Sequence, residues 1–158
     1  MKTIYNSAGE IIKKCPDSIR PSVCAIIINK NNEILLEQRS DNYLWGLPGG
    51  GVEIGESITQ ALHREVMEET GLKVEIIELI GIYSDPKNYS IMSYPDGGLV
   101  QYVSITFKCK PISRSIKISD ESINLKFFDI EKLPEKLMVG HKSRINDSIT
   151  NINLPIIK

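Results

Sequence analysis

Runs of apolar residues predict a chain rich in β-strands. Residues 22–29 (SVCAIIIN) and 33–38 (EILLEQ) are two such runs, and the asparagines at 31 and 32 between them are typical of a turn. These two runs are therefore expected to pair as a β-hairpin. β-Branched, aliphatic and aromatic residues predict three further strands, at residues 73–83, 99–108 and 124–128.

The clearest helix signal starts at Ser57. Gln60 stands three residues later, as in a capping box, and good helix formers follow as far as Glu69. Gly71 is expected to end this helix, because glycine readily takes the left-handed conformation found after the last helical turn. A helical turn is expected over residues 130–135, and a C-terminal helix over residues 141–149.

Glycine, proline and polar residues mark the expected loops. Residues 45–51 (WGLPGGG) predict a loop in front of the first helix. Residues 85–98 predict a longer loop, and a loop of that length in a compact domain commonly has a function. Residues 1–20 are mixed and polar, which indicates either an extra edge strand or a dimer arm.

The order of these elements is strand, strand, loop, helix, three strands and helix. It predicts a mixed β-sheet with helices on its faces. The periodicity alone assigns the fold to the α+β or α/β class. No internal repeat, low-complexity segment or linker interrupts the 158 residues, so residues 1–158 are expected to form one domain.

Composition narrows the choice of partners and of cellular compartment. The formal net charge of −1 gives no electrostatic reason to expect a nucleic-acid polymer or an anionic membrane as partner. No apolar stretch approaches the roughly 20 residues needed to span a bilayer, and the first residues do not resemble a signal peptide. The odd number of cysteines favours reduced thiols and a cytoplasmic location, with Cys24 and Cys109 as small core residues.

Three carboxylates on the first helix are the main candidates for chemistry. Glu65, Glu68 and Glu69 are related by i, i+3 and i+4, so a helix places them on one side. Like charges at this spacing repel, and a divalent cation removes that penalty. Ligand sets made only of oxygen suit Mg²⁺ or Mn²⁺ rather than zinc. Seen alone, however, such a cluster is more often a solvated acidic helix face.

The residues around these three glutamates favour a metal site over a solvated acidic helix face. Residues 50–72 read GGVEIGESITQALHREVMEETGL. This segment resembles the Nudix box, G-x5-E-x7-R-E-U-x-E-E-x-G-U with U aliphatic, at every fixed position. The preceding residues 47–50 (LPGG) are similar to the usual lead-in of that family. The resemblance implies an α/β/α sandwich with a mixed sheet and a loop–helix–loop that binds metal.

The resemblance also implies roles for individual residues. Glu65, Glu68 and Glu69 correspond to the metal carboxylates, and the carbonyl of Gly50 to a further metal ligand. Glu56 and Arg64 correspond to an ion pair that fastens the loop to the helix and supports catalysis. Glu121 lies in a loop outside the box, where several family members carry a catalytic or substrate-contacting acid. The alternative for Glu121 is a solvated turn residue.

Other residues are candidates for contacts with the substrate. Arg39 is expected either to meet a phosphate or ribose or to form a surface ion pair. Trp45 is expected either to stack on a base or to pack beneath the loop, and Tyr89 lies where some family members carry a substrate-contacting tyrosine. The basic residues at the start of the last predicted helix favour a solvated helix start over a phosphate site: His141, Lys142 and Arg144.

The resemblance therefore predicts an enzyme. The expected reaction is cleavage of a phosphoanhydride bond in a nucleoside diphosphate derivative by water activated with Mg²⁺ or Mn²⁺. ADP-ribose or a related ADP-sugar, and a nucleoside triphosphate, are the leading substrate classes, and the small nucleotide is the expected partner. The alternative is a nucleotide sensor that uses the fold without turnover. A homodimer is expected by analogy with small members of the family.

Overall fold

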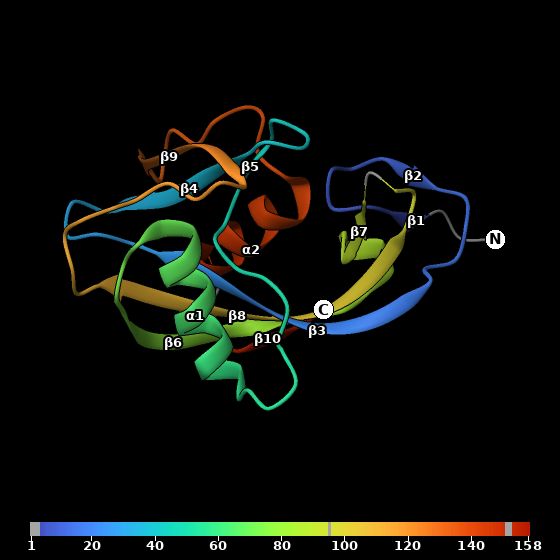
Figure 1. Ribbon diagram of the computed structural model, residues 1–158, viewed down its shortest axis with the longest axis horizontal. Coiled ribbons are helices and arrows are strands. Elements are labelled where there is room, and N and C mark those ends of the chain that lie inside the picture. Colours follow the sequence, from blue (N-terminus) through green and yellow to red (C-terminus); the bar gives the residue numbers. More distant parts are fainter. Residues whose placement is uncertain (1–3, 95, 151–152) are drawn as a thin grey trace.

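The main β-sheet is mixed, as the sequence predicts. The computed structural model describes residues 4–94, 96–150 and 153–158 (Figure 1). The sheet runs in the order β10 (Ile156–Ile157), β6 (Val74–Tyr83), β8 (Leu99–Pro111) and β3 (Ser18–Ile27), with β7 (Ile91–Ser93) on β8. Parallel pairs join β3 to β8 and β10 to β6, and β6 and β7 each pair antiparallel with β8.

The expected hairpin between the first two apolar runs is present only at its turn among the described residues, where Ile28 and Ile34 form an antiparallel bridge and the Asn29 N–H donates to the Glu33 carbonyl at 2.9 Å. Beyond the turn the expectation is wrong, because β4 (Glu33–Arg39) belongs to a separate antiparallel sheet with β5 (Trp45–Gly46) and β9 (Ser122–Asp129). The reason is that another segment occupies the free edge of β3. Backbone N–H groups of Val23 and Ala25 donate to carbonyls of the loop 47–51 at 2.9 and 2.8 Å.

Two helices cover opposite faces of β3, which confirms the α/β/α sandwich (Figure 1). Alternate residues of the strand point to opposite sides. On one side Val23, Ala25 and Ile27 pack with residues of α1 (Ile58–Thr70); on the other Cys24 and Ile26 pack with residues of α2 (Val139–Thr150). This double burial explains why residues 22–29 are apolar without interruption.

Helix α1 has the predicted ends. The Ser57 side chain accepts from the Gln60 backbone N–H at 3.2 Å, and the Gln60 side chain accepts from the Ser57 N–H at 2.8 Å. At the other end Gly71 has φ 69°, and its N–H donates to the Met67 carbonyl at 2.9 Å. The capping box and the glycine stop are both confirmed, so the register of the acidic residues on α1 is well defined.

The chain ends and loops contain more structure than expected. The N-terminal segment forms a small antiparallel pair, β1 (Ile4–Tyr5) with β2 (Ile11–Ile12), which joins the main sheet through a bridge between Asn6 and Ile91 (Figure 1). Residues 18–20 begin β3, at the edge of the main sheet. The segment 85–98 contains a 3₁₀ turn, Pro86–Asn88, and β7. Residues 130–135 form turns rather than a helical turn. The C-terminal helix is confirmed as α2.

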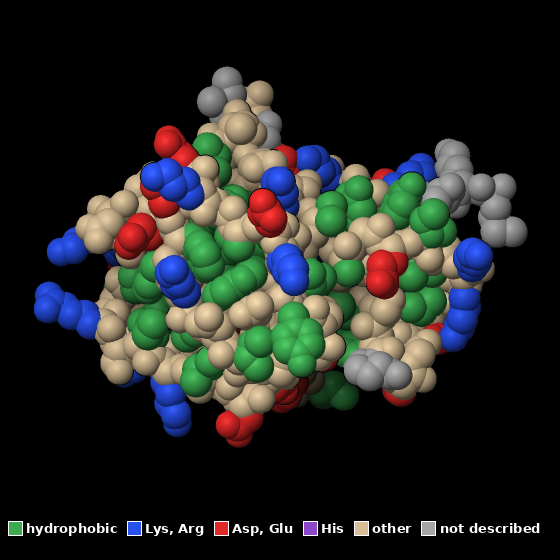
Figure 2. All heavy atoms as spheres, turned by 90° about the horizontal axis from the view of Figure 1, so that it is seen from above, with side chains coloured by type: hydrophobic (Ala, Val, Ile, Leu, Met, Phe, Trp, Pro, Cys, Tyr) green, Lys and Arg blue, Asp and Glu red, His purple; other side chains and the backbone are tan. Residues whose placement is uncertain are grey.

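The surface carries charges of both signs. On the face shown in Figure 2, lysine and arginine side chains are interspersed with acidic ones among apolar side chains. No extended field of one sign covers that face, in keeping with the net charge of −1. Within the described residues no helix has the length and apolar character needed to cross a membrane.

Candidate active site

The glycine-rich loop lies directly on β3 and against α1. A Cβ on Gly49 would stand 2.2 Å from the Val23 carbonyl oxygen, and Gly49 has φ 149°. A Cβ on Gly50 would stand 2.5 Å from the Glu65 carboxyl carbon. Glycine is therefore required at position 49, where the backbone of the strand cannot move away, whereas a side chain at position 50 would displace the Glu65 carboxylate.

The expected ion pair between loop and helix is present. Arg64 donates to Glu56 through Nε at 2.6 Å and through Nη2 at 2.9 Å, a bidentate arrangement. Its Nη2 also donates to the Gly51 carbonyl at 3.0 Å. The Arg64 guanidinium lowers the pKa of Glu56 to about 2. Arg64 thus ties the loop to α1 at two points.

The three acidic residues of α1 have different environments. Glu69 accepts from the Gly49 N–H at 2.7 Å, and burial, followed by the nearby Glu37, raises its pKa well above the usual value. Burial also raises the pKa of Glu65, whose side chain is 15% exposed. The side chain of Glu68 is 61% exposed and receives only a 3.2 Å bond from Arg64. Two carboxylates are therefore desolvated, and the third stands at the rim.

A further buried carboxylate was missed from the sequence. Glu37 of β4 is 4% exposed and accepts from the Ser122 hydroxyl at 2.8 Å. Burial raises the pKa of Glu37, and the charges of Glu121 and Glu65 act in the same direction. The signal available was its position two residues after the buried Leu35, on the same face of the strand.

The donor set suits a hard divalent cation. Glu65, Glu68, Glu69 and Glu37 offer only oxygen, and the desolvated carboxylates among them repel one another, so a cation would be stabilising there. Within the ranges that the structure describes, no three acidic, histidine or cysteine side chains already surround one point. Instead, Arg64 forms ion pairs with Glu65 at 2.8 Å and with Glu68 at 3.2 Å. The Gly50 carbonyl accepts from the Val23 N–H at 2.9 Å and keeps a second lone pair.

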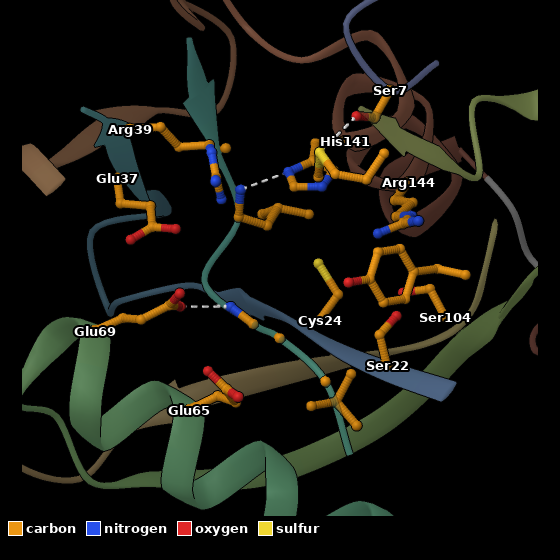
Figure 3. A pocket seen from close by; sticks show the side chains of 18 of the residues that line it. Ser7, Ser22, Cys24, Glu37, Arg39, Glu65, Glu69, Ser104, His141 and Arg144 are labelled. Carbon is orange, nitrogen blue, oxygen red and sulfur yellow. Dashed lines mark hydrogen bonds between the residues drawn. The ribbon is translucent and has the colours of Figure 1, made fainter. Parts of the chain in front are cut away.

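These carboxylates line one end of a cavity of about 370 Å³ (Figure 3). That volume lies within the range of small-molecule sites. Glu121 and Tyr89 also line the cavity, as expected for substrate or catalytic contacts. Arg39 lines the cavity and forms a bidentate pair with Asp41 at 2.9 and 2.8 Å, so the ion pair is observed, and contact with a phosphate or ribose stays a prediction.

Trp45 does not belong to this set. It is 9% exposed, packs edge to face on Phe128 with ring centroids 4.8 Å apart, and lies in the core beside α2. The structure therefore places Trp45 beneath the loop, in agreement with the packing alternative, and gives it no role in contacting a base. Cys24 and Cys109 are buried free thiols, as predicted.

The prediction that the basic residues at the start of α2 are solvated is wrong for two of the three. Arg144 is 6% exposed and lines the cavity together with His141, whereas Lys142 is exposed. The Nδ1 atom of His141 accepts from the Leu47 N–H at 2.8 Å. Two of the three basic residues expected on a solvated helix start are thus part of the cavity wall. Their side chains reach it only because α2 packs against β3 and the loop.

The class of the protein follows from three features: the α/β/α sandwich, the glycine-rich loop that Arg64 fastens to α1, and the acidic residues of α1. Comparisons with known proteins agree with this class. The family profile "NUDIX domain" matches residues 18–147. The chain belongs to the Nudix hydrolase family and is a hydrolase of phosphorus-containing acid anhydrides.

Individual relatives agree with this assignment. An "ADP-ribose pyrophosphatase" of Methanocaldococcus jannaschii is 38% identical over 140 residues, covering 86% of this chain and 78% of that protein. A Bacillus subtilis protein, provisionally named an 8-oxo-dGTP diphosphatase, is 34% identical over 122 residues, covering 77% and 74% of the two chains. A crystal structure of a MutT protein from Methanosarcina mazei superposes with a TM-score of 0.70 at 26% identity, covering 89% of this chain and all of that one.

Proposed function

We propose that this chain is a pyrophosphohydrolase that cleaves a phosphoanhydride bond of a nucleoside diphosphate derivative with the help of Mg²⁺ or Mn²⁺. The observation that carries the proposal is the gathering of carboxylates from α1 and β4 at one end of the cavity. Glu37 and Glu69 are buried at that end without an ion pair among the described residues, and a buried charge without a partner is costly. A bound cation and its diphosphate ligand would offset that cost.

In this proposal the metal is held by oxygen atoms of Glu65, Glu68, Glu69 and the Gly50 carbonyl. When bound, a divalent ion neutralises diphosphate charge and lowers the pKa of a water molecule. The role of Arg64 and Glu56 is to position the loop and α1 relative to each other. Glu121, at the cavity edge, is the candidate for accepting a proton from the attacking water.

Two substrate classes are supported by the relatives. The M. jannaschii protein is named for ADP-ribose and the B. subtilis protein for an oxidised nucleoside triphosphate. Both contain a nucleoside attached to a phosphoanhydride, so both suit a site that binds the diphosphate at its acidic end. Arg39 and Tyr89 are proposed to contact the attached nucleotide, because both line the same cavity as the carboxylates.

The test is product release from a panel of purified compounds with Mg²⁺, with Mn²⁺ and with chelator. The panel contains ADP-ribose, ADP-glucose, NADH, diadenosine polyphosphates, and normal and 8-oxo nucleoside triphosphates. Turnover of one compound far above the rest, abolished by chelator, is the expected result. Calorimetric binding of a compound without any turnover would instead support the nucleotide-sensor alternative.

The sequence also supports three broader proposals about the protein. We infer one domain over residues 1–158, a cytoplasmic location and a homodimer. The domain proposal is supported by the family match over residues 18–147. Sedimentation of the purified protein tests the homodimer directly, since a monomer and a dimer of a 17.7 kDa chain separate clearly.

A further inference from the structure

The cavity has two chemically different ends. Glu37, Glu65 and Glu69 lie on one side in Figure 3, whereas Arg144 lies on the other with Cys24. The other labelled side chains of that second side are those of His141, Ser7, Ser22 and Ser104, and none of them is acidic. None of the carboxylates that line the described cavity comes from β3, β8 or α2, the elements that build this second side.

Arg144 is a buried charge whose position is not explained by an ion pair. Its guanidinium carbon lies 5.1 Å above the centre of the Tyr83 ring, and the group also contacts the Cys24 thiol. Among the described residues it has no salt bridge within 4.0 Å. The acid one turn along α2, Asp147, is bound by Lys158 at 2.7 Å and by the Tyr83 hydroxyl at 3.1 Å.

A guanidinium in this position has unused donors. It carries five N–H groups, and neither an aromatic face nor a thiol satisfies more than a small part of them. A buried cation without an anion is strongly destabilising, and hydrogen-bond acceptors on a bound molecule would offset that cost. Arg144 lines the cavity, and the guanidinium is therefore available to a bound molecule.

His141 adds a donor of the same kind. Because its Nδ1 accepts from the Leu47 N–H, the proton of the neutral ring is on Nε2. Burial, together with the charge of Arg144, lowers the pKa of His141 well below the usual value, so the ring stays neutral. This end of the cavity therefore offers N–H donors from two side chains and no carboxylate acceptor.

We propose that Arg144 and His141 form a donor subsite that binds the end of the substrate remote from the scissile diphosphate, through two adjacent hydrogen-bond acceptors on that end. The proposal rests on the proposed function, because that function places the diphosphate at the acidic end. Two sources carry such an acceptor pair. One is the O6/N7 edge of a guanine-type base, which matches a guanidinium bidentately; the other is a phosphate group. The amino edge of adenine does not match, because it presents a donor.

The test is calorimetric titration in the presence of chelator, where the unneutralised carboxylates repel phosphate and binding reports on the donor end. The probes are GMP, AMP and inorganic phosphate, and the proteins are wild type, Arg144→Gln and Lys142→Met. GMP and AMP differ only in the base. Lys142 is exposed on the same helix, so its variant controls for loss of a nearby positive charge.

Two results would support the subsite and identify its ligand. A preference for GMP over AMP of about tenfold or more, lost in Arg144→Gln and kept in Lys142→Met, assigns it to the base edge. Equal binding of GMP and AMP, with inorganic phosphate also bound and all three weakened in Arg144→Gln, assigns it to phosphate. Binding unchanged by Arg144→Gln, or absent in wild type, would overturn the proposal.

A second measurement follows ligand binding in the wild-type protein, so its result does not depend on whether Arg144→Gln folds. The Arg144 Nε–H resonance, assigned with Arg144→Lys, is expected to shift during titration with GMP or with phosphate. A resonance that does not move at saturating ligand would also overturn the proposal. Since no hydrolysis is measured, failure of the subsite is distinguished from failure of the proposed reaction, which the activity panel tests separately.

Discussion

The two ends of the cavity differ in how the chain builds them. The acidic end comes mostly from one continuous segment, the loop and helix over residues 49–69, in which Arg64 fastens the parts together. The donor end comes from β3, β8 and α2, which are far apart in the sequence. The first end therefore depends on local geometry within one segment, and the second depends on how distant elements of the chain pack together.

This difference indicates that one end serves the reaction at the diphosphate and the other serves substrate selection. A segment that presents carboxylates to a diphosphate can remain the same whatever group the diphosphate carries. The wall opposite it can change without disturbing that chemistry, because it comes from other elements. We therefore expect substitutions at the acidic end to reduce turnover and those at the donor end to alter the choice of substrate.

The largest effect is expected for Glu68→Gln. Removing one carboxylate that would hold the metal costs several kcal/mol of charge stabilisation, so kcat should fall by roughly 100-fold or more. The side chain is 61% exposed, so the melting temperature should hardly change. Steady-state kinetics and thermal unfolding of the same preparation measure the two quantities.

Glu75→Gln is the matched control for that variant. Glu75 is an exposed glutamate on β6 that pairs with Lys110 at 2.8 Å on the surface. Its replacement should leave kcat unchanged. If Glu68→Gln retained wild-type kcat, Glu68 would be removed from the metal site, and the acidic end would have to work through the other carboxylates.

Gly50→Ala should reduce activity by between roughly tenfold and 100-fold, the range typical for displaced residues around a metal site. The added Cβ would stand 2.5 Å from the Glu65 carboxyl carbon, so the Glu65 side chain must move. Gly51→Ala is the neighbouring comparison, because its Cβ would meet no atom within 4 Å. Kinetics of both variants should separate them; similar losses in the two would point to loop flexibility rather than displacement of Glu65.

The sequence predicts the features that depend on neighbouring residues, and it does not predict those that depend on packing between distant segments. The helix ends and the Arg64–Glu56 pair were predictable, because each depends on residues less than ten positions apart. The hairpin was not, since the free edge of β3 is bonded by the loop 47–51 and not by β4. Arg144 was read as solvent-exposed because a short-range pattern carries no information about what packs against α2.

Glu56→Gln should have a smaller effect, about tenfold on kcat, because Glu56 acts by holding Arg64 and the loop. The concentration of metal needed for half-maximal activity should rise in parallel. A double-mutant cycle with Arg64→Lys gives the decisive comparison: residues that act as one pair should show losses well below additive. Fully additive losses would mean that Glu56 and Arg64 contribute independently.

The smallest expected effect concerns the donor end and pH. The pKa of His141 is lowered well below its usual value in the folded state, chiefly by burial, while the unfolded chain titrates near 6.5. Below about pH 6.5 the unfolded state therefore binds a proton that the folded state does not. The stabilisation is complete above that pH and is lost as the pH falls toward the lowered pKa, on the order of 1 kcal/mol by pH 5.5.

Urea unfolding at pH 7.5 and pH 5.5 measures this loss. His141→Gln should remove that part of the pH dependence, since glutamine does not take up a proton and its side-chain oxygen can still accept from the Leu47 N–H. His63→Gln replaces an exposed histidine on α1 and is the matched control. An equal change of the pH dependence in both variants would show that the ring of His141 is not held neutral by its surroundings, and the donor end would then carry a titrating charge beside Arg144.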